Sequence, residues 1–358
     1  MFRSPIIFRE GSYTYQDIIS FFSSHRVWST RDIYDDQLQE YFLITHPQYK
    51  HHDTFSALFS TYKTQVLNGR IEAMCGNWVY FPWSGRMVHM VSEGMHHALR
   101  TNRNHLLITQ EEQKMLLNVS IAVAGLSIGS SIISTLVHNG IGRNLRLADH
   151  DIFETTNMNR VRSRIDQVGV SKVSIVTEQL FEINPYLVID PFSQGVDASN
   201  LVDFVRPSST YPLILFEAID DFKMKVRLRL QAKKNGVPVV MLTNLGDGIL
   251  IDIERYDIDP QTKMFNGLVG DVPERILSSS CTEEDMKQFA VSLVGKEHVP
   301  QRAFLSLEQM GKTLVGRPQL MGTVTASSGI APYIVRRMLF GPSLASGRYY
   351  IHFDTVLS

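Results

Sequence analysis

The sequence predicts an α/β fold built on a Rossmann-like, mostly parallel sheet with helices on both faces. Short apolar runs alternate with segments of helical period between residues 119 and 243. A glycine-containing turn, Gly125 to Gly129, separates the first such run from the first such helix. Strands and helices that alternate in this way form parallel sheets covered by helices. A chain of 358 residues with 44% hydrophobic residues is also long and apolar enough to bury a large core.

Three parts are expected along the chain. Residues 1–115 mix aromatic-rich segments with histidine pairs and show no clean period, so we expect a mixed α/β or helical N-terminal region. Whether that region contacts a substrate or a second subunit stays open. Residues 116–255 contain the alternating pattern and form the Rossmann-like core. Residues 256–358 form a C-terminal extension, in which the polar, turn-rich residues 256–284 are expected to be a long loop.

Each element of the core follows from a local pattern. Five apolar runs predict the parallel strands, at 119–124, 145–148, 188–190, 213–217 and 237–243. Three segments of helical period predict the helices between them, at 132–137 before the stop signal Asn139-Gly140, at 170–181, and at the basic amphipathic segment 221–234. The extension adds an antiparallel strand at 249–253, a helix at 330–339 and a strand at 348–353.

Composition excludes several classes of protein. The 35 Lys and Arg against 36 Asp and Glu give a net charge of −1, so no overall field favours nucleic acid or an acidic membrane. Two cysteines outside any C-x-x-C pair suit neither a disulfide framework nor a zinc site. The sequence has no apolar stretch of 18 residues and no leader-like N-terminus, so we expect a cytoplasmic protein without a membrane partner.

The turn Gly125-Leu-Ser-Ile-Gly129 indicates an anion site. Glycines let backbone amides approach a phosphate, and the positive end of the following helix favours its charge. A tight turn that binds nothing would look the same. The segment also matches G-x-S-x-G, the nucleophile elbow of hydrolases, with Ser127 as nucleophile and His298 or His352 as a later base. Against that alternative, neither sheet strands nor an oxyanion-hole motif precede the turn.

Charged and amide side chains after the next strands favour a nucleoside triphosphate over a dinucleotide. Asp149 lies 24 residues after Gly125 at the end of the second strand, where nucleotide folds place an acid on the ribose. Asn157, Arg160 and Lys172 follow, and cationic groups of this kind neutralise phosphate oxygens.

Two carboxylates end the fourth strand. Asp220 and Asp221 are hard oxygen ligands that suit Mg²⁺ beside a triphosphate. On local grounds, either carboxylate could equally cap the helix that follows.

These motifs in order resemble those of the ThiF/MoeB-like adenylating enzymes, relatives of the ubiquitin-activating enzymes. The resemblance covers residues 100–255 and rests on G-I-G (140–142), L-x-x-A-D-x-D (145–151), T-N-M-N-R (156–160), V-G-V-S-K (168–172), I-N-P (183–185) and Asp220. The chain looks most like a bacterial subgroup whose turn reads G-L-S-V-G. That subgroup shares W-V-Y-x-P-W (78–83), R-x-x-R-N (100–104) and S-G-R (346–348).

The resemblance implies ATP-dependent adenylation of a carboxylate, with release of pyrophosphate. The acceptor in this family is the C-terminus of a small ubiquitin-like or sulfur-carrier protein, or a peptide, and the enzyme is a homodimer or pseudo-dimer. By matching position, the ATP-binding residues would be Gly125, Ser127, Gly129, Asp149 on the ribose, Asp151, and Asn157, Arg160 and Lys172 on the phosphates. Asp220 would be the Mg²⁺-linked carboxylate, and Arg103 would reach across the dimer to the partner's triphosphate. Residues 256–358 would then complete the adenylation domain.

Three departures from the family pattern keep alternatives open. The glycine turn is one residue short and contains Ser127, and the paired zinc cysteines are absent. Cys281 lies in the polar region where some relatives carry a thioester-forming nucleophile, but the segment 278–282 is equally an ordinary loop. A catalytically inactive nucleotide-binding partner protein therefore remains an alternative. An NAD(P)-dependent oxidoreductase is the other.

Overall fold

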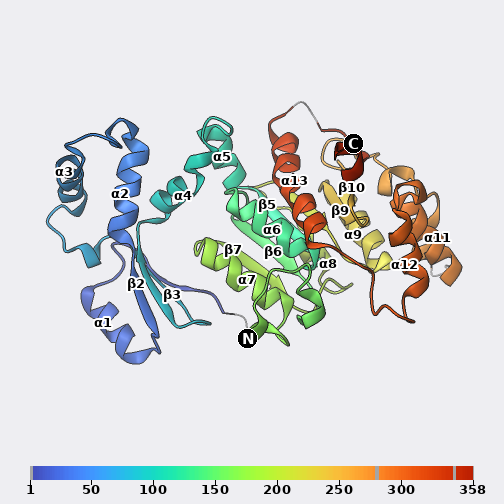
Figure 1. Cartoon of the computed structure of the whole chain (residues 1–358), viewed down its shortest axis with the longest axis horizontal. Coiled ribbons are helices and arrows are strands. Elements are labelled where there is room, and N and C mark those ends of the chain that lie inside the picture. The colour runs from blue at the N-terminus through green and yellow to red at the C-terminus, as the bar shows by residue number, and fades with distance from the viewer. Residues whose placement is uncertain (1–2, 279–281, 342–343, 358) are drawn as a thin grey trace. The chain divides into compact units, whose positions relative to one another are not determined.

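The computed structural model of the chain describes residues 3–278, 282–341 and 344–357 (Figure 1). The chain divides into two compact units. The first contains residues 1–113 and 178–186, and the second contains residues 114–177 and 187–358. In the part of the chain that the structure describes, no helix combines the length and hydropathy needed to span a membrane.

The first unit is a mixed α/β structure. Its four strands are β1 (Ile6–Phe8), β2 (Ser29–Asp32), β3 (Asn77–Phe81) and β4 (Arg86–Met90), in the spatial order β1-β3-β4-β2. Only the β2–β4 pair is parallel. Its helices are α1 (Tyr15–Ser24), α2 (Tyr34–Thr45), α3 (Phe55–Leu67) and α4 (Glu93–Thr101). Helix α1 begins where Thr14 and Asp17 cap each other's backbone amides, and its Phe21 packs among buried aromatic side chains of β3.

The second unit is organised around a seven-stranded sheet in the order β11-β10-β9-β8-β5-β6-β7. The strands are β5 (Ser120–Ala124), β6 (Asn144–Ala148), β7 (Val188–Phe192), β8 (Leu213–Glu217), β9 (Val239–Asn244), β10 (Gly248–Glu254) and β11 (Gly347–His352). Strands β5 to β9 are parallel, and β10 and β11 extend the sheet in antiparallel fashion. The predicted Rossmann-like, mostly parallel sheet is therefore confirmed.

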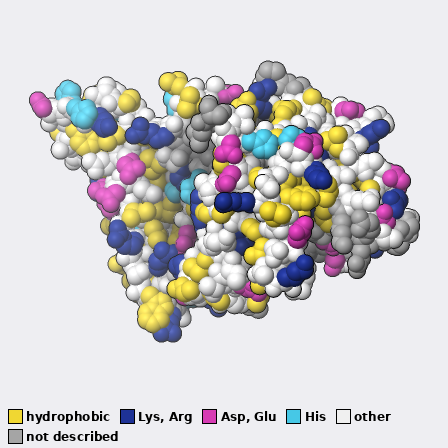
Figure 2. Space-filling view, turned by 45° about the vertical axis from the view of Figure 1, so that its right-hand side comes forward, with side chains coloured by type: hydrophobic (Ala, Val, Ile, Leu, Met, Phe, Trp, Pro, Cys, Tyr) yellow, Lys and Arg dark blue, Asp and Glu magenta, His cyan; other side chains and the backbone are white. Residues whose placement is uncertain are grey.

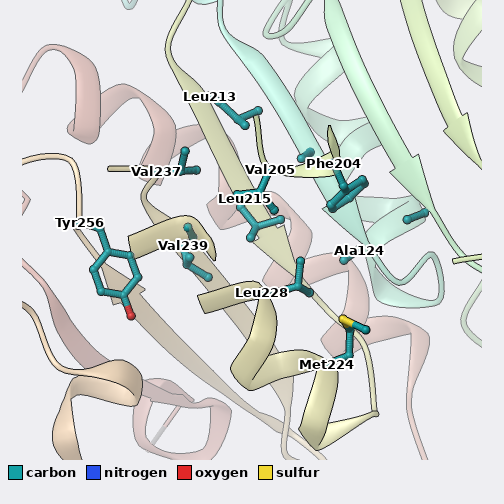
Figure 3. Close-up of a cluster of buried hydrophobic side chains, with 13 residues drawn as sticks. Ala124, Phe204, Val205, Leu213, Leu215, Met224, Leu228, Val237, Val239 and Tyr256 are labelled. Atoms are coloured by element: carbon teal, nitrogen blue, oxygen red, sulfur yellow. The ribbon is translucent and has the colours of Figure 1, made fainter. Parts of the chain in front are cut away.

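Helices connect and cover these strands. They are α5 (Gln110–Leu117), α6 (Ile128–His138), α7 (Lys172–Ile183), α8 (Leu201–Phe204), α9 (Phe222–Asn235), α10 (Val272–Leu277), α11 (Glu283–Val294), α12 (Gln301–Gln309), α13 (Met321–Leu339) and α14 (Phe353–Leu357). On one face, Leu215 of β8 and Val239 of β9 pack with Met224 and Leu228 of α9 (Figure 3). Elsewhere α13 packs against α6 and β9.

The strand order creates a crevice in the middle of the sheet. The chain runs outward from β5 through β6 to β7, then returns to the other side of β5 with β8 and β9. Ligands of open α/β sheets bind beyond the carboxyl ends of the strands at such a reversal point. The glycine turn after β5 and the acidic loop after β8 are therefore expected to be neighbours.

Two expectations for the C-terminal extension are wrong in part. Residues 256–284 were expected to be a loop, but helix α10 (Val272–Leu277) lies within them, with Ile276 buried in an apolar cluster. The helix expected at 330–339 begins at Met321 instead. Its first half is rich in Thr, Ser and Gly, which are weak helix formers, and it contacts α6, so tertiary packing overrides the local preference.

Figure 2 shows acidic and basic side chains interspersed on one face of the molecule. This distribution agrees with the net charge of −1. Any anion-binding site must therefore depend on a few placed cations.

Candidate functional site

The glycine turn and the acidic loop meet at Gly125. Its backbone has a φ of +88°, and a Cβ atom there would lie 2.5 Å from the carbonyl oxygen of Ala218. The amide of Ala218 in turn donates to the carbonyl oxygen of Ala124 at 2.8 Å. Only glycine accepts both this φ and this close approach, so the residue joins the ends of β5 and β8.

Ser127 stands at the start of helix α6 and contacts Arg160. The Ser127 hydroxyl oxygen accepts a hydrogen bond from Nε of Arg160 at 3.2 Å. Gly129 lies in the first turn of α6, where a Cβ atom would lie 2.7 Å from Val123 of β5. The structure thus brings Ser127 and Arg160 together. Gly129 is needed because helix α6 packs closely against β5 at this position.

A hydrolase would require a histidine on Ser127. The two candidates bond to each other instead, with 3.3 Å between Nδ1 of His298 and Nε2 of His352, while Ser127 bonds to Arg160. The hydrolase alternative has no catalytic geometry among these three residues.

Asp149 ties together the loops around the crevice. Its two carboxylate oxygens accept hydrogen bonds from the backbone amides of Leu126, at 2.6 Å, and Asp151, at 2.8 Å. The residue is buried, so these bonds fix the glycine turn to the loop after β6. A role on a ribose, which the sequence predicts, would use the remaining acceptor capacity of the same carboxylate.

Lys172 forms an ion pair at the start of helix α7. Its ammonium nitrogen lies 2.6 Å from Oδ2 of Asp151, and the lysine is buried whereas the aspartate is exposed. An exposed partner can rotate away, which would leave the buried ammonium group for a phosphate. Asn157 differs, because its side-chain oxygen accepts the amide hydrogen of Glu154 at 3.1 Å and so caps its own turn.

Asp220 is a highly exposed carboxylate of the crevice. Its side chain is 93% exposed, and its carboxylate lies 3.9 Å from the guanidinium of Arg317. Burial lowers the pKa of Arg160, while Asp220 raises it and Arg317 lowers it further, so these three charges share one field. Asp221 caps helix α9 by accepting the amide hydrogen of Met224 at 3.1 Å. A carboxylate is an oxygen ligand of the kind that suits Mg²⁺, and Asp220 is the residue that would hold such an ion.

One cavity of about 320 Å³ collects most of the predicted residues. Its walls include six of them: Gly125, Ser127, Asp149, Asp151, Lys172 and Asp220. We call it the nucleotide cavity. Arg160 reaches its edge through Ser127, whereas Asn157 and Gly129 are not among its wall residues.

Two further predictions are not tested by the structure. Arg103 is exposed and belongs to the first unit, so its action at a triphosphate stays a prediction. Cys281 lies outside the described residues, and a thioester there also stays a prediction. The other cysteine, Cys75, is buried in the first unit, and burial raises the pKa of its thiol.

Sequence reasoning missed a layer of buried charges under the acidic loop. Glu217, the last residue of β8, accepts the amide hydrogen of Ile219 at 2.9 Å. Its carboxylate also lies 2.7 Å from the ammonium of Lys225 and 2.7 Å from the guanidinium of Arg229. Glu217 therefore holds the backbone that carries Asp220.

The same layer continues to β10. Arg229 also bonds to Glu254 at 2.7 Å, and Glu254 accepts hydrogen bonds from the Tyr256 hydroxyl and the Phe265 amide, both at 2.7 Å. Burial would raise the pKa of Glu217, but attraction by Lys225 and Arg229 lowers it overall.

Two of the cations on α9 are thus internal, contrary to the interpretation of 221–234 as a basic amphipathic helix. The spacing of these two cations in the sequence could have indicated that they are buried. Lys225 and Arg229 are four residues apart, on one face of the helix that follows Glu217.

Comparisons with known proteins agree with this arrangement. A sequence model of the ThiF family matches residues 101–333. The uncharacterized protein MT1398 of Mycobacterium tuberculosis is 33% identical over 280 residues, which are 78% of this chain and 38% of that protein. The SAMP-activating enzyme E1 of Haloferax volcanii is 29% identical over 225 residues, 62% of this chain and 80% of that enzyme.

The fold has a counterpart among solved structures. The crystal structure of PaaA aligns with a TM-score of 0.52 at 16% identity, over 87% of this chain and 82% of that one. The chain spans less than two fifths of the length of its mycobacterial relative.

Proposed function

The chain belongs to the ThiF family, and from this premise we propose that it catalyses the ATP-dependent adenylation of a carboxylate. The observation that carries the proposal is the nucleotide cavity, because the glycine turn, Lys172 and Asp220 line it together at the reversal point of the sheet. The acceptor is a small carrier protein or a peptide, as the name of the SAMP-activating relative suggests for that enzyme. The enzyme works as a homodimer.

The reaction needs positioning and charge neutralisation. The acceptor carboxylate attacks the α-phosphorus of ATP, an oxygen–phosphorus bond forms, and the bond to pyrophosphate breaks. Lys172 and Arg160 neutralise phosphate oxygens, while the amides that begin α6 point at them. Mg²⁺, when held by Asp220, would neutralise the departing pyrophosphate. No general base is required, because the attacking carboxylate is already ionised.

Exchange of labelled pyrophosphate into ATP tests the proposal. The purified chain should show exchange when a candidate acceptor is present, and Asp220→Asn should reduce it by roughly 10²–10³-fold through loss of one charge-stabilising contact. Asp203→Asn, an exposed carboxylate on α8, is the matched control and should keep wild-type exchange. Unchanged exchange in Asp220→Asn would contradict the assigned mechanism.

A protein that binds ATP but releases neither AMP nor pyrophosphate would support the inactive nucleotide-binding alternative. Competition by NAD(P) against ATP would support the oxidoreductase. Calorimetry with ATP and with NAD(P) separates these outcomes.

A further inference from the structure

A second, larger cavity has a mostly apolar lining, to which Lys296, Glu308 and Arg317 also contribute. Its volume is about 620 Å³. It is lined by residues from the end of β9, from helices α11 and α12, and from 317–318. The apolar side chains in its walls include Leu245, Val291, Val294, Val299, Ala303 and Phe304. We call it the apolar pocket.

Shared walls connect the two cavities. A small cavity of about 100 Å³ has Ser127, Ala218, Ile219 and Asp220 in common with the nucleotide cavity. The same small cavity has Asn244, Ala290, Val294 and Arg317 in common with the apolar pocket. The small cavity therefore borders both the apolar pocket and the nucleotide cavity, and a ligand long enough to extend through it would contact both.

Asn244 stands at the junction of these cavities. It is the last residue of β9 and only 8% exposed, and neither its side-chain oxygen nor its side-chain nitrogen has a hydrogen-bond partner among the residues that the structure describes. Native proteins rarely leave a buried amide unsatisfied, because the lost hydrogen bonds cost stability. A ligand that both donates and accepts, such as a peptide backbone next to a carboxylate, would satisfy it.

Arg317 supplies the complementary charge at the same junction. Its guanidinium is partly exposed, and its ion pair with Asp220 is long, at 3.9 Å. A guanidinium presents a planar fork of donors that matches a carboxylate. A carboxylate could therefore lie between Arg317 and Asn244 while an attached apolar group enters the pocket.

We propose that the apolar pocket binds a bulky apolar side chain from one of the last two residues of the acceptor, whose terminal carboxylate contacts Asn244 and Arg317. This inference rests on the proposed function and specifies its acceptor. An acceptor that ends in two glycines would leave the pocket unfilled. Burial of one leucine side chain improves affinity by about ten- to hundredfold.

Calorimetry on the full chain with a non-hydrolysable ATP analogue tests the preference. The probes are acetyl-glycyl-leucyl-glycine, acetyl-glycyl-glycyl-leucine and acetyl-triglycine. At least one leucyl peptide should bind about tenfold or more tightly than triglycine. Its C-terminal amide should bind more weakly than its free acid, because the carboxylate contact is lost. Equal binding of the leucyl peptides and triglycine overturns the inference.

Two variants fill the pocket from different helices. Ala303→Trp on α12 and Val294→Phe on α11 should each abolish the leucine preference, and the second serves if the first does not fold. The matched control is Leu305→Trp, because Leu305 lies on α12, is 49% exposed and is not a wall residue of the pocket. A preference that survives in both filled variants also overturns the inference.

Pyrophosphate exchange separates this inference from the proposed function. A leucine preference in binding without any exchange would refute adenylation and keep the pocket. Exchange that is equally fast with triglycine and both leucyl peptides would keep adenylation and refute the pocket.

Discussion

Glu217 and Asp220 are three residues apart, and their carboxylates belong to two different layers of charge. The Glu217 side chain is fully buried and pairs with two cations, whereas the Asp220 side chain is 93% exposed and its carboxylate lies 3.9 Å from the guanidinium of Arg317. The lower layer, which also contains Arg229 and Glu254, fixes the backbone of the crevice. The upper layer can exchange partners when a ligand arrives. The difference teaches that a charge near a site is informative for function only when its burial and partners are known.

Removing the central cation of the lower layer should have the largest effect on stability and is the strongest test of the difference between the layers. Arg229→Met should lower the free energy of unfolding by about 3–5 kcal/mol, because Glu217 and Glu254 would stay buried without their shared partner. Urea unfolding at neutral pH measures the change. The matched control is Lys234→Met, an exposed cation on the same helix, which should change stability little. Equal effects of the two substitutions would show that the buried layer is not structural.

A substitution in the glycine turn, which joins the ends of β5 and β8, should have the next largest effect on stability. Gly125→Ala places a Cβ atom against the Ala218 carbonyl oxygen at a φ of +88°, which should cost about 1–3 kcal/mol of stability. The same variant should also lose ATP affinity, because the turn and the Asp220 loop move apart. Gly169→Ala is a useful control, since it has a similar φ of +89° but open space around the added atom. A loss no larger than that of the control would contradict a role for close approach.

The pH dependence of stability sharpens the description of the lower layer. Burial raises the pKa of Glu254 from its ordinary 4.5 to about 7, and Arg229 opposes the rise while Asp252 adds to it. The folded protein therefore holds this proton more tightly than the unfolded chain does. Its stabilising effect is complete below about pH 4.5 and is lost as the pH rises through about 7.

Denaturant unfolding of wild type and Glu254→Gln across this range measures the effect. The stability of wild type relative to the variant should fall as the pH rises. A difference that stays constant, or grows, would contradict the raised pKa.

The smallest effect on stability is expected in the upper layer, at Asp220, and it distinguishes the roles of the two layers. Asp220→Asn should leave the melting temperature unchanged, because the side chain is almost fully exposed, while pyrophosphate exchange collapses. Differential scanning calorimetry on the samples used for exchange checks this. A lower melting temperature would mean that Asp220 supports the fold as well.

Patterns in the sequence predicted the parts of the site that follow from strand order. Gly125 and Asp149 come directly after parallel strands and Asp220 comes three residues after one, and the carboxyl ends of such strands share one edge of the sheet. Their grouping around one cavity was therefore expected. The contact between Ser127 and Arg160 depends on the path of a long loop, which no local period describes.

The apolar pocket could not be predicted from the sequence, for a different reason. Two of its walls, α11 and α12, are helices in a region without a clean strand–helix alternation. Asn244 could be placed at the end of a predicted strand, but its lack of partners depends on how those helices pack around it. Burial and hydrogen-bond satisfaction are properties of the assembled chain.

The ion pairs of Arg229 also affect how cooperatively the strands of the sheet unfold. Its two carboxylate partners come from β8 and β10, which flank β9 on opposite sides, so one side chain links the two neighbours of β9 through buried ion pairs. Opening β10 alone would leave a buried charge without its partner, so local opening of that kind has a high free-energy cost. We therefore expect the parallel and antiparallel halves of the sheet to open together, so that their amide hydrogens exchange with solvent as one unit.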